Sequence, residues 1–197
     1  RRWHSLSGGV ALGVFLAEHL LVNASALGGD ARFDGVVGSI ERLAILPILE
    51  LVFIVLPLAV HVGIGIKLLR SSSTPDREMD RYGDRRLWVV QRGSGTVVLS
   101  FMLAHLWEFR VQCLFFGLEA AALHTKLIAH LSWTWFGVPW VALLYVIGIG
   151  ATTFHFSNGL FAATDAWGVW PATRSGGRRA ARAISSGLGL VFFLIGT

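Results

Sequence analysis

Four histidines of this 197-residue chain, His19, His61, His105 and His155, lie far inside long apolar stretches. A polar side chain at membrane depth is costly and is usually kept for a function. Neutral imidazole is a common axial ligand of haem iron, so four such residues could hold two b-type haems. The alternative for any single one is a plain hydrogen bond to a neighbouring helix.

Five apolar stretches must position these histidines: residues 3–23, 43–69, 87–107, 135–156 and 180 onward. Each has about 20 residues, the length that crosses a hydrocarbon layer of ~30 Å as a helix. Only 15% of the residues are charged, against about a quarter in soluble proteins. The sequence therefore predicts an all-α membrane protein, one transmembrane domain over residues 1–197 with five transmembrane helices.

The segments between these stretches are more polar. Residues 30–34, 71–86 and 171–179 are rich in Gly, Pro, Ser or charge and are expected to be connections. Residues 111–130 are mixed, and we expect a short interfacial segment there rather than a span. The first residues show no signal-peptide pattern, so we interpret them as mature or trimmed chain. A single cysteine, Cys113, gives neither a disulfide nor a thiolate cluster within the chain.

The basic residues predict the orientation. Thirteen Lys and Arg lie at the N-terminus and in regions 67–92 and 174–182, whereas the opposite side has Arg32, Arg42, Arg110 and Lys126. Cytoplasmic loops of membrane proteins are enriched in Lys and Arg, so the N-terminus is expected in the cytoplasm. The same bias explains the net charge of +5 without a nucleic-acid partner.

Orientation gives each histidine a depth. His19 and His105 come 16 and 17 residues after Trp3 and Trp88 at the cytoplasmic starts of their spans, which puts both in the outer half. The other two come 18 and 20 residues after the outer starts of theirs, which puts both in the inner half. The pattern thus predicts two pairs, His19 with His105 and His61 with His155, at levels roughly 15 Å apart.

Residues eleven apart share a helix face, because eleven residues make about three turns. Gly8 and Ser94 each precede an outer-level histidine by eleven and would leave room for the inner haem; Gly148 would do so at the outer level. Ordinary packing of small residues between membrane helices is the alternative. Glu50 shares a face with His61 at the outer level, where an acid could exchange protons, although a snorkelling position would also fit.

Several short segments carry a family resemblance: HSLSG at 4–8, EHL at 18–20, LPL at 56–58 before His61, QRGSG at 91–95 before His105, and HFSNGL at 155–160. Together they resemble the two-haem cytochrome b subunit of succinate dehydrogenase and fumarate reductase, the anchor made of one polypeptide. The resemblance covers nearly the whole chain. One position departs from it: Thr153 stands where some fumarate reductases have a glutamate on a proton route, so that route is not expected here.

The resemblance implies a partner arrangement. A flavoprotein subunit with FAD and a subunit with iron–sulfur clusters would dock at the cytoplasmic face of a bacterial inner membrane. Electrons would pass through an inner haem on His61 and His155, then an outer haem on His19 and His105, to menaquinone near the outer surface. This chain would be the quinone-reactive subunit of complex II, with no catalytic residue for the dicarboxylate.

Two further groups of residues are site candidates. Ser5, Trp88, Arg92 and His4 are expected at the inner face, where haem propionates need charged or hydrogen-bonding partners, although Arg92 would also suit a positive-inside anchor. Candidates for the quinone site are Glu50, Glu41 and Glu108, with His124 and His130, for which an interfacial position is favoured.

Two other classes of function remain open on the residues alone. A cytochrome b of a hydrogenase or formate dehydrogenase, or a cytochrome b561-like protein, would also hold haem between histidines, but the order of the motifs favours the first family. A proton or metal-ion transporter could use buried His and Glu, and its spans should then show broken helices or acids level with the histidines.

Overall fold

The computed structural model describes residues 2–71, 82, 84–119, 122–169 and 175–197. Within these residues the chain is helical, and its β-type pairing is limited to one backbone bridge between Trp135 and Val138. Five of the described helices are long and apolar enough to cross a membrane. The prediction of an all-α bundle of five membrane helices is therefore confirmed.

The first three spans are each interrupted by a π-helical turn. The first span consists of α1 (Arg2–Leu6), the π turn η1 (Ser7–Ala11) and α2 (Leu12–Ala24), and the 3₁₀ turn η2 (Ser25–Gly28) continues it. The second consists of α4 (Leu46–Glu50), the π turn η3 (Leu51–Val55) and α5 (Leu56–Arg70). The third consists of α7 (Arg85–Leu106), the π turn η4 (Trp107–Val111) and α8 (Gln112–Phe115). The fourth and fifth are α10 (Trp140–Ala166) and α11 (Ser175–Gly196). Single π turns inside helices occur frequently at functional sites.

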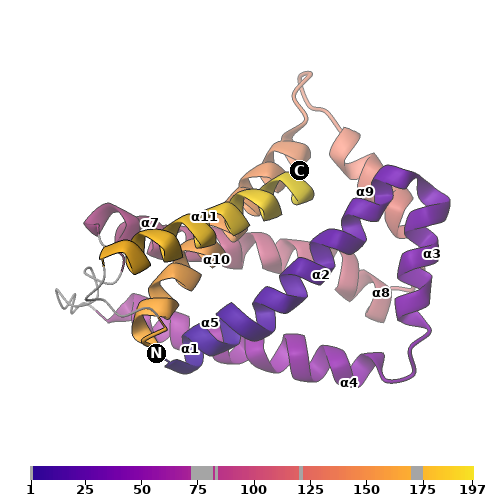
Figure 1. The fold of residues 1–197 in the computed structure, drawn as a ribbon. Helices are drawn as coiled ribbons and strands as arrows, with labels where there is room; N and C mark the ends of the chain where they lie inside the picture. Colours follow the sequence, from indigo (N-terminus) through magenta and orange to yellow (C-terminus); the bar gives the residue numbers. More distant parts are fainter. Residues whose placement is uncertain (1, 72–81, 83, 120–121, 170–174) are drawn as a thin grey trace.

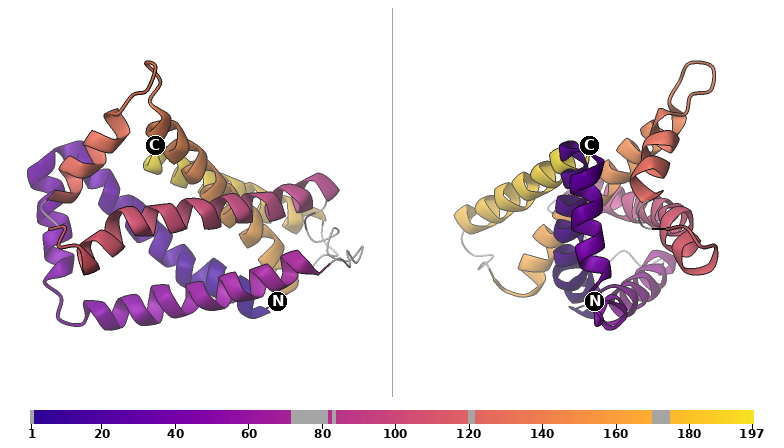
Figure 2. Two further views of the ribbon diagram at one scale, coloured as in Figure 1. Left: turned by 180° about the vertical axis from the view of Figure 1, so that it is seen from behind. Right: turned by 90° about the vertical axis from the view of Figure 1, so that its right-hand side faces the viewer.

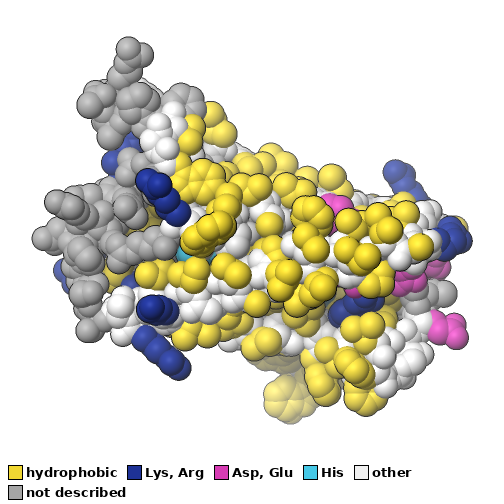
Figure 3. Space-filling model, turned by 90° about the horizontal axis from the view of Figure 1, so that it is seen from below, with side chains coloured by type: hydrophobic (Ala, Val, Ile, Leu, Met, Phe, Trp, Pro, Cys, Tyr) yellow, Lys and Arg dark blue, Asp and Glu magenta, His cyan; other side chains and the backbone are white. Residues whose placement is uncertain are grey.

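The bundle has two distinct ends. Figures 1 and 2 show the N-terminus, the end of α5 and the starts of α7 and α11 at one end, which we call the N-terminal end. The helices α3 (Asp30–Glu41) and α9 (Leu123–Ser132) lie at the other, the α3–α9 end. In Figure 3 hydrophobic side chains cover the middle of the face shown, and charged side chains gather toward its ends, as expected around a membrane.

The cytoplasmic position of the N-terminal end stays a prediction. Of the thirteen basic residues on which it depends, Arg1, Arg77, Arg81 and Arg174 lie outside the described residues, as do large parts of the connections 71–86 and 171–179. The described basic residues near this end include Arg2, Arg70, Arg85 and Arg182.

One helix was missed by the sequence pattern. Residues 30–34 were expected to form a connection, but they begin α3, a helix of 12 residues. Gly29, with a φ of 88°, breaks the chain direction before it, and Asp30 in its first turn suits the positive end of the helix dipole. Phe33 is only 5% exposed and lies with its ring centroid 5.5 Å from that of His124 in α9. This contact between distant segments is invisible in the local pattern.

Three predicted boundaries of the fourth and fifth spans were wrong. The fourth span was expected from residue 135, but α10 begins at Trp140. A tight turn precedes it, in which Phe136 and Gly137 have φ values of 51° and 73°, so the helix cannot start earlier. α10 then continues ten residues past the expected end, and α11 begins five residues before its expected start.

The segment 111–130 was expected to be short and interfacial, and the structure differs from this in its first part. Its first part continues the third span as α8, so the expectation of an interfacial segment is wrong there. Its last part falls in α9, whose 10 residues are too few to cross a hydrocarbon layer of ~30 Å.

Helix α10 is the centre of the packing, because its contacts with α7 and α11 are the most extensive between the described helices. Small buried residues line these contacts, among them Ala163 of α10 and Ala181 of α11. At Gly189 of α11 an added Cβ would lie 2.7 Å from the Ser157 side chain. Such close approach of small residues is the usual way in which membrane helices associate, and it fixes α10, which carries His155.

Candidate functional site

The structure brings together the histidines that depth had paired. The rings of His19 in α2 and His105 in α7 have centroids 5.7 Å apart and planes at 84°. The rings of His61 in α5 and His155 in α10 have centroids 6.2 Å apart and planes at 87°. We call the first two the outer pair and the last two the inner pair.

These distances fit ligation of one metal ion by two imidazoles. With metal–nitrogen bonds of about 2 Å, two imidazoles on opposite sides of one ion have ring centroids roughly 6 Å apart. Among the described residues no three His, Cys, Asp or Glu side chains converge as a metal site, so the histidines meet as pairs. Their role as haem ligands stays a prediction that this geometry allows.

Hydrogen bonds leave one nitrogen of each inner ring available. Nδ1 of His61 lies 2.9 Å from the carbonyl oxygen of His4, and Nδ1 of His155 lies 3.1 Å from that of Gln91. A carbonyl oxygen only accepts, so the bond of His61 to His4 assigns the ring proton to Nδ1 and leaves the lone pair of Nε2. In His155 the shorter of the two contacts of Nδ1 with Gln91, to the carbonyl oxygen rather than to the side-chain nitrogen at 3.2 Å, favours the same assignment. A backbone carbonyl behind Nδ1 is a usual support for a histidine that binds metal through Nε2.

The outer pair is held differently. Nδ1 of His105 lies 3.3 Å from the hydroxyl oxygen of Tyr145. The side-chain amide of Asn23 lies 3.4 Å from Nε2 of His19, but it has a shorter bond, 2.7 Å, to the carbonyl oxygen of the same histidine. Asn23 can therefore stay hydrogen-bonded if Nε2 binds another group.

Three of the predicted environment residues, His4, Ser94 and Gly8, lie against the inner rings. The ring of His4 stacks on that of His61, with centroids 3.8 Å apart and planes at 14°, and its Nδ1 lies 3.0 Å from the His61 carbonyl oxygen. The hydroxyl of Ser94 lies 3.3 Å from Nδ1 of His155. His4 and Ser94 are thus positioned to orient the inner pair.

Gly8 lies directly against His61, and its replacement by alanine is expected to disturb the inner pair. A Cβ at Gly8 would lie 2.3 Å from Cε1 and 2.5 Å from Nδ1 of His61. Since the His61 ring is held by its bond to His4, we expect Gly8→Ala to cost about 1–3 kcal/mol, as overpacking does. Thermal unfolding in detergent would measure this loss.

Gly63→Ala is the matched control for this substitution. An added Cβ at Gly63, on the same helix as His61, meets nothing within 4 Å. Equal unfolding temperatures for the two variants would show that the His61 ring is not confined by Gly8.

The remaining inner-face candidates lie at the N-terminal end. The indole of Trp167 donates to the Ser5 hydroxyl at 3.1 Å. The guanidinium of Arg92 donates to the carbonyl oxygen of Leu68 at 3.0 Å and lies 4.8 Å from the centroid of the Trp88 ring. The bond of Arg92 joins α7 to the end of α5, and the bond of Trp167 joins the residue after α10 to α1. A role of these residues toward haem propionates stays a prediction.

Gly148 lies near the outer pair, as predicted, but its space is filled. A Cβ there would lie 2.4 Å from the Phe101 ring, which in turn stacks near His105 with centroids 5.8 Å apart. The clearance that the spacing suggested is occupied by an aromatic side chain of α7.

Two polar residues of the inner site lie in segments that carried the family resemblance but were not named as site candidates. Gln91 and Asn158 are 8% and 7% exposed. The Gln91 amide donates to the His155 carbonyl oxygen at 3.1 Å, and the Asn158 amide donates to the Gln91 side-chain oxygen at 2.9 Å. Their polarity inside apolar spans was the available signal.

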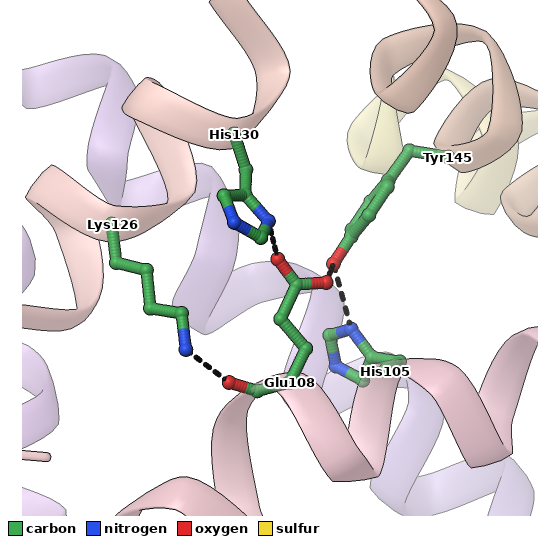
Figure 4. A network of polar contacts seen from close by, with 5 residues as sticks. All are labelled: His105, Glu108, Lys126, His130 and Tyr145. Carbon is green, nitrogen blue, oxygen red and sulfur yellow. Dashed lines mark hydrogen bonds and ion pairs between the residues drawn. The ribbon is translucent and has the colours of Figure 1, made fainter. Parts of the chain in front are cut away.

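Polar side chains gather behind His105 at the α3–α9 end (Figure 4). The carboxylate of Glu108 of η4 contacts Nδ1 of His130 of α9 and accepts a hydrogen bond of 2.9 Å from the Tyr145 hydroxyl of α10. The ammonium of Lys126 donates to the Glu108 carbonyl oxygen at 2.6 Å. We call Glu108, Tyr145, His130 and Lys126 the outer network.

The other quinone candidates do not join this network. Glu50 forms an ion pair with Arg110. Glu41 is exposed at the end of α3, and His124 lies 2.8 Å from the carboxylate of Asp30. Among the predicted acids, Glu108 is therefore the one that hydrogen bonds through Tyr145 link to a paired histidine, His105.

Comparison with known proteins identifies the family. The chain is 32% identical over 177 residues to the succinate dehydrogenase cytochrome b558 subunit of Bacillus subtilis (strain 168), an alignment that covers 89% of this chain and 82% of the relative. The chain belongs to the succinate dehydrogenase cytochrome b subunit family. No family model and no solved structure matches it.

Membership in the succinate dehydrogenase cytochrome b subunit family confirms the resemblance drawn from the short segments. It favours this family over the hydrogenase and formate dehydrogenase cytochromes, which the order of motifs had already disfavoured. It also agrees with the structure, since a membrane subunit needs spans such as the five observed here.

Proposed function

We propose that this chain is the membrane anchor and electron-transfer subunit of a bacterial succinate:menaquinone oxidoreductase. A flavoprotein subunit with FAD and an iron–sulfur subunit would dock at the N-terminal end, for which the basic residues predict a cytoplasmic position. Menaquinone would react at the α3–α9 end, within the bacterial inner membrane. Dicarboxylate chemistry would belong to the flavoprotein subunit.

The observation that carries this proposal is the meeting of four histidines in two pairs, 5.7 and 6.2 Å between ring centroids. The related subunit is named a cytochrome b558, which is a haem protein. The inner pair would hold one b haem and the outer pair another. Haem, when bound, supplies one-electron exchange, and the chain holds the imidazoles in place and keeps water away with apolar helices.

The outer network supports a quinone site at the α3–α9 end. A quinone takes up protons with its electrons, so its site needs hydrogen-bonding groups in reach of water. Glu108 is 17% and His130 49% exposed at their side chains, and both lie beside the outer pair. We assign the menaquinone headgroup to this region, with Glu108 as its principal acid and Glu50 as the second candidate.

A haem measurement on the purified complex tests the proposal. A pyridine haemochrome assay with a reduced-minus-oxidised spectrum is expected to give two b haems per chain, together with a co-purifying flavoprotein that carries covalent flavin. A stable, folded and haem-free preparation would overturn the haem assignment.

A further inference from the structure

Tyr145 connects one candidate ligand to a carboxylate. Its hydroxyl oxygen lies 3.3 Å from Nδ1 of His105 and 2.9 Å from Oε2 of Glu108 (Figure 4). His105 and Glu108 are three residues apart, so they project from neighbouring positions of the same helix. Tyr145 reaches both of them from α10.

The carboxylate at the end of this chain of hydrogen bonds determines where the protons lie. A carboxylate oxygen accepts and does not donate, so the single hydroxyl proton of Tyr145 is directed to Glu108. The hydroxyl oxygen can then only accept from His105, which places the ring proton on Nδ1 and leaves Nε2 free. The bonds therefore run from the His105 ring N–H through the Tyr145 hydroxyl to the carboxylate.

Among the described residues, the contacts of the inner ring nitrogens include no carboxylate. Nδ1 of His61 faces a backbone carbonyl oxygen at 2.9 Å. Nδ1 of His155 faces three neutral groups: the Gln91 carbonyl oxygen at 3.1 Å, the Gln91 side-chain nitrogen at 3.2 Å and the Ser94 hydroxyl at 3.3 Å. His105 instead donates toward a group that is itself polarised by a carboxylate. A histidine whose N–H is bonded toward a carboxylate is a more basic ligand.

Glu108 is held at its side chain and at its backbone. Its carboxylate contacts Nδ1 of His130, and its backbone carbonyl oxygen accepts from Lys126 at 2.6 Å. Both come from α9, while Tyr145 comes from α10. The acceptor at the end of the bond chain is therefore held by two elements besides its own helix.

We infer that Tyr145 and Glu108 are positioning residues that orient the His105 ring and set the redox potential of the outer haem separately from that of the inner one. The inference rests on the proposed function, in which His105 ligates that haem. A more basic axial imidazole favours ferric over ferrous iron, so the bond chain lowers the potential of the outer haem alone. The alternative is that Tyr145 and Glu108 only fill a polar gap between the helices. The same contacts would then be present, but they would not change the potential of the outer haem.

Redox titration of the haems in the whole complex, followed by visible spectra without added quinone, tests the inference. Tyr145→Phe is expected to raise the potential of the outer haem and to leave the inner one unchanged. We expect the ratio of ferric to ferrous outer haem at a fixed potential to fall about tenfold, in line with the effect of losing such a support. For one electron this corresponds to a shift of about 59 mV.

Two further variants sharpen the result. Glu108→Gln keeps the side-chain shape and removes the charge, and it is expected to shift the same haem in the same direction. Tyr82→Phe is the matched control, because Tyr82 lies at the N-terminal end, where its backbone carbonyl accepts from Arg182. It is expected to leave both potentials unchanged.

The outcomes separate this inference from the function on which it rests. Unchanged potentials in Tyr145→Phe, or equal shifts of both haems, would overturn the inference while two haems remain bound. If replacing His105 leaves two haems per chain, the ligand assignment itself fails. A shift confined to the outer haem in Tyr145→Phe and Glu108→Gln supports both.

Discussion

A His61→Leu variant is expected to retain one b haem per chain and to lose electron transfer from succinate to menaquinone. His61 and His155 form the inner pair, 6.2 Å between ring centroids, and leucine offers no nitrogen to replace Nε2. Loss of a ligand should cost more than the roughly 10- to 100-fold that loss of its hydrogen-bonding support costs. Haem content and succinate:menaquinone activity of the purified complex measure both effects.

Oxidation of succinate by a soluble artificial acceptor should persist in this variant, because that reaction would use the partner subunits. His124→Leu is the matched control, since His124 is a poorly exposed histidine bonded to Asp30 in the α3–α9 end and belongs to neither pair. It should keep two haems. Two haems in His61→Leu would show that the pairing does not reflect ligation.

Glu108→Gln is expected to lower menaquinone turnover by about 100-fold, the size of effect that a lost proton-transfer group typically has. Both haems should stay bound, because Glu108 reaches the outer pair only through Tyr145. Glutamine keeps the shape of the side chain but cannot take up or release a proton. Steady-state turnover with a soluble menaquinone analogue, with haem content determined on the same sample, is the measurement.

Glu41→Gln provides the comparison for this variant. Glu41 lies in the same end of the molecule but is exposed at the end of α3, so turnover is expected to stay near that of the unchanged protein. Equal activity of the two variants would exclude Glu108 from the quinone site. Glu50, which is paired with Arg110, would then be the remaining candidate acid.

The two histidine pairs could be predicted from the sequence pattern. Spans of about 20 apolar residues, oriented by basic loops, give each residue a depth, because a helix rises 1.5 Å per residue. Depth alone matched His19 with His105 and His61 with His155, and the structure places each pair within ring-to-ring reach. The identification of the family from short segments around these residues was likewise confirmed.

The sequence named Glu108 and His130 of the outer network as quinone candidates, but it could not bring them together or add Tyr145 and Lys126 to them. Tyr145 lies in an apolar run of α10 and is 37 residues from Glu108, and nothing in the local sequence relates the two. His130 reaches the same acid from α9, a helix too short to have a defined depth. The helix α3 was not predicted for a similar reason, because its buried Phe33 contacts His124, which lies in a distant segment of the sequence.

From composition, length and periodicity along the chain, the sequence by itself determined the class of the fold and the number of spans and predicted a depth for each histidine. The family came from the short segments around the histidines. Only the tertiary structure decided which side chains support the rings: the His4 carbonyl behind His61, the Gln91 carbonyl behind His155, and Tyr145 with Glu108 behind His105. Such contacts depend on how helices rotate and pack against one another, which no single helix encodes.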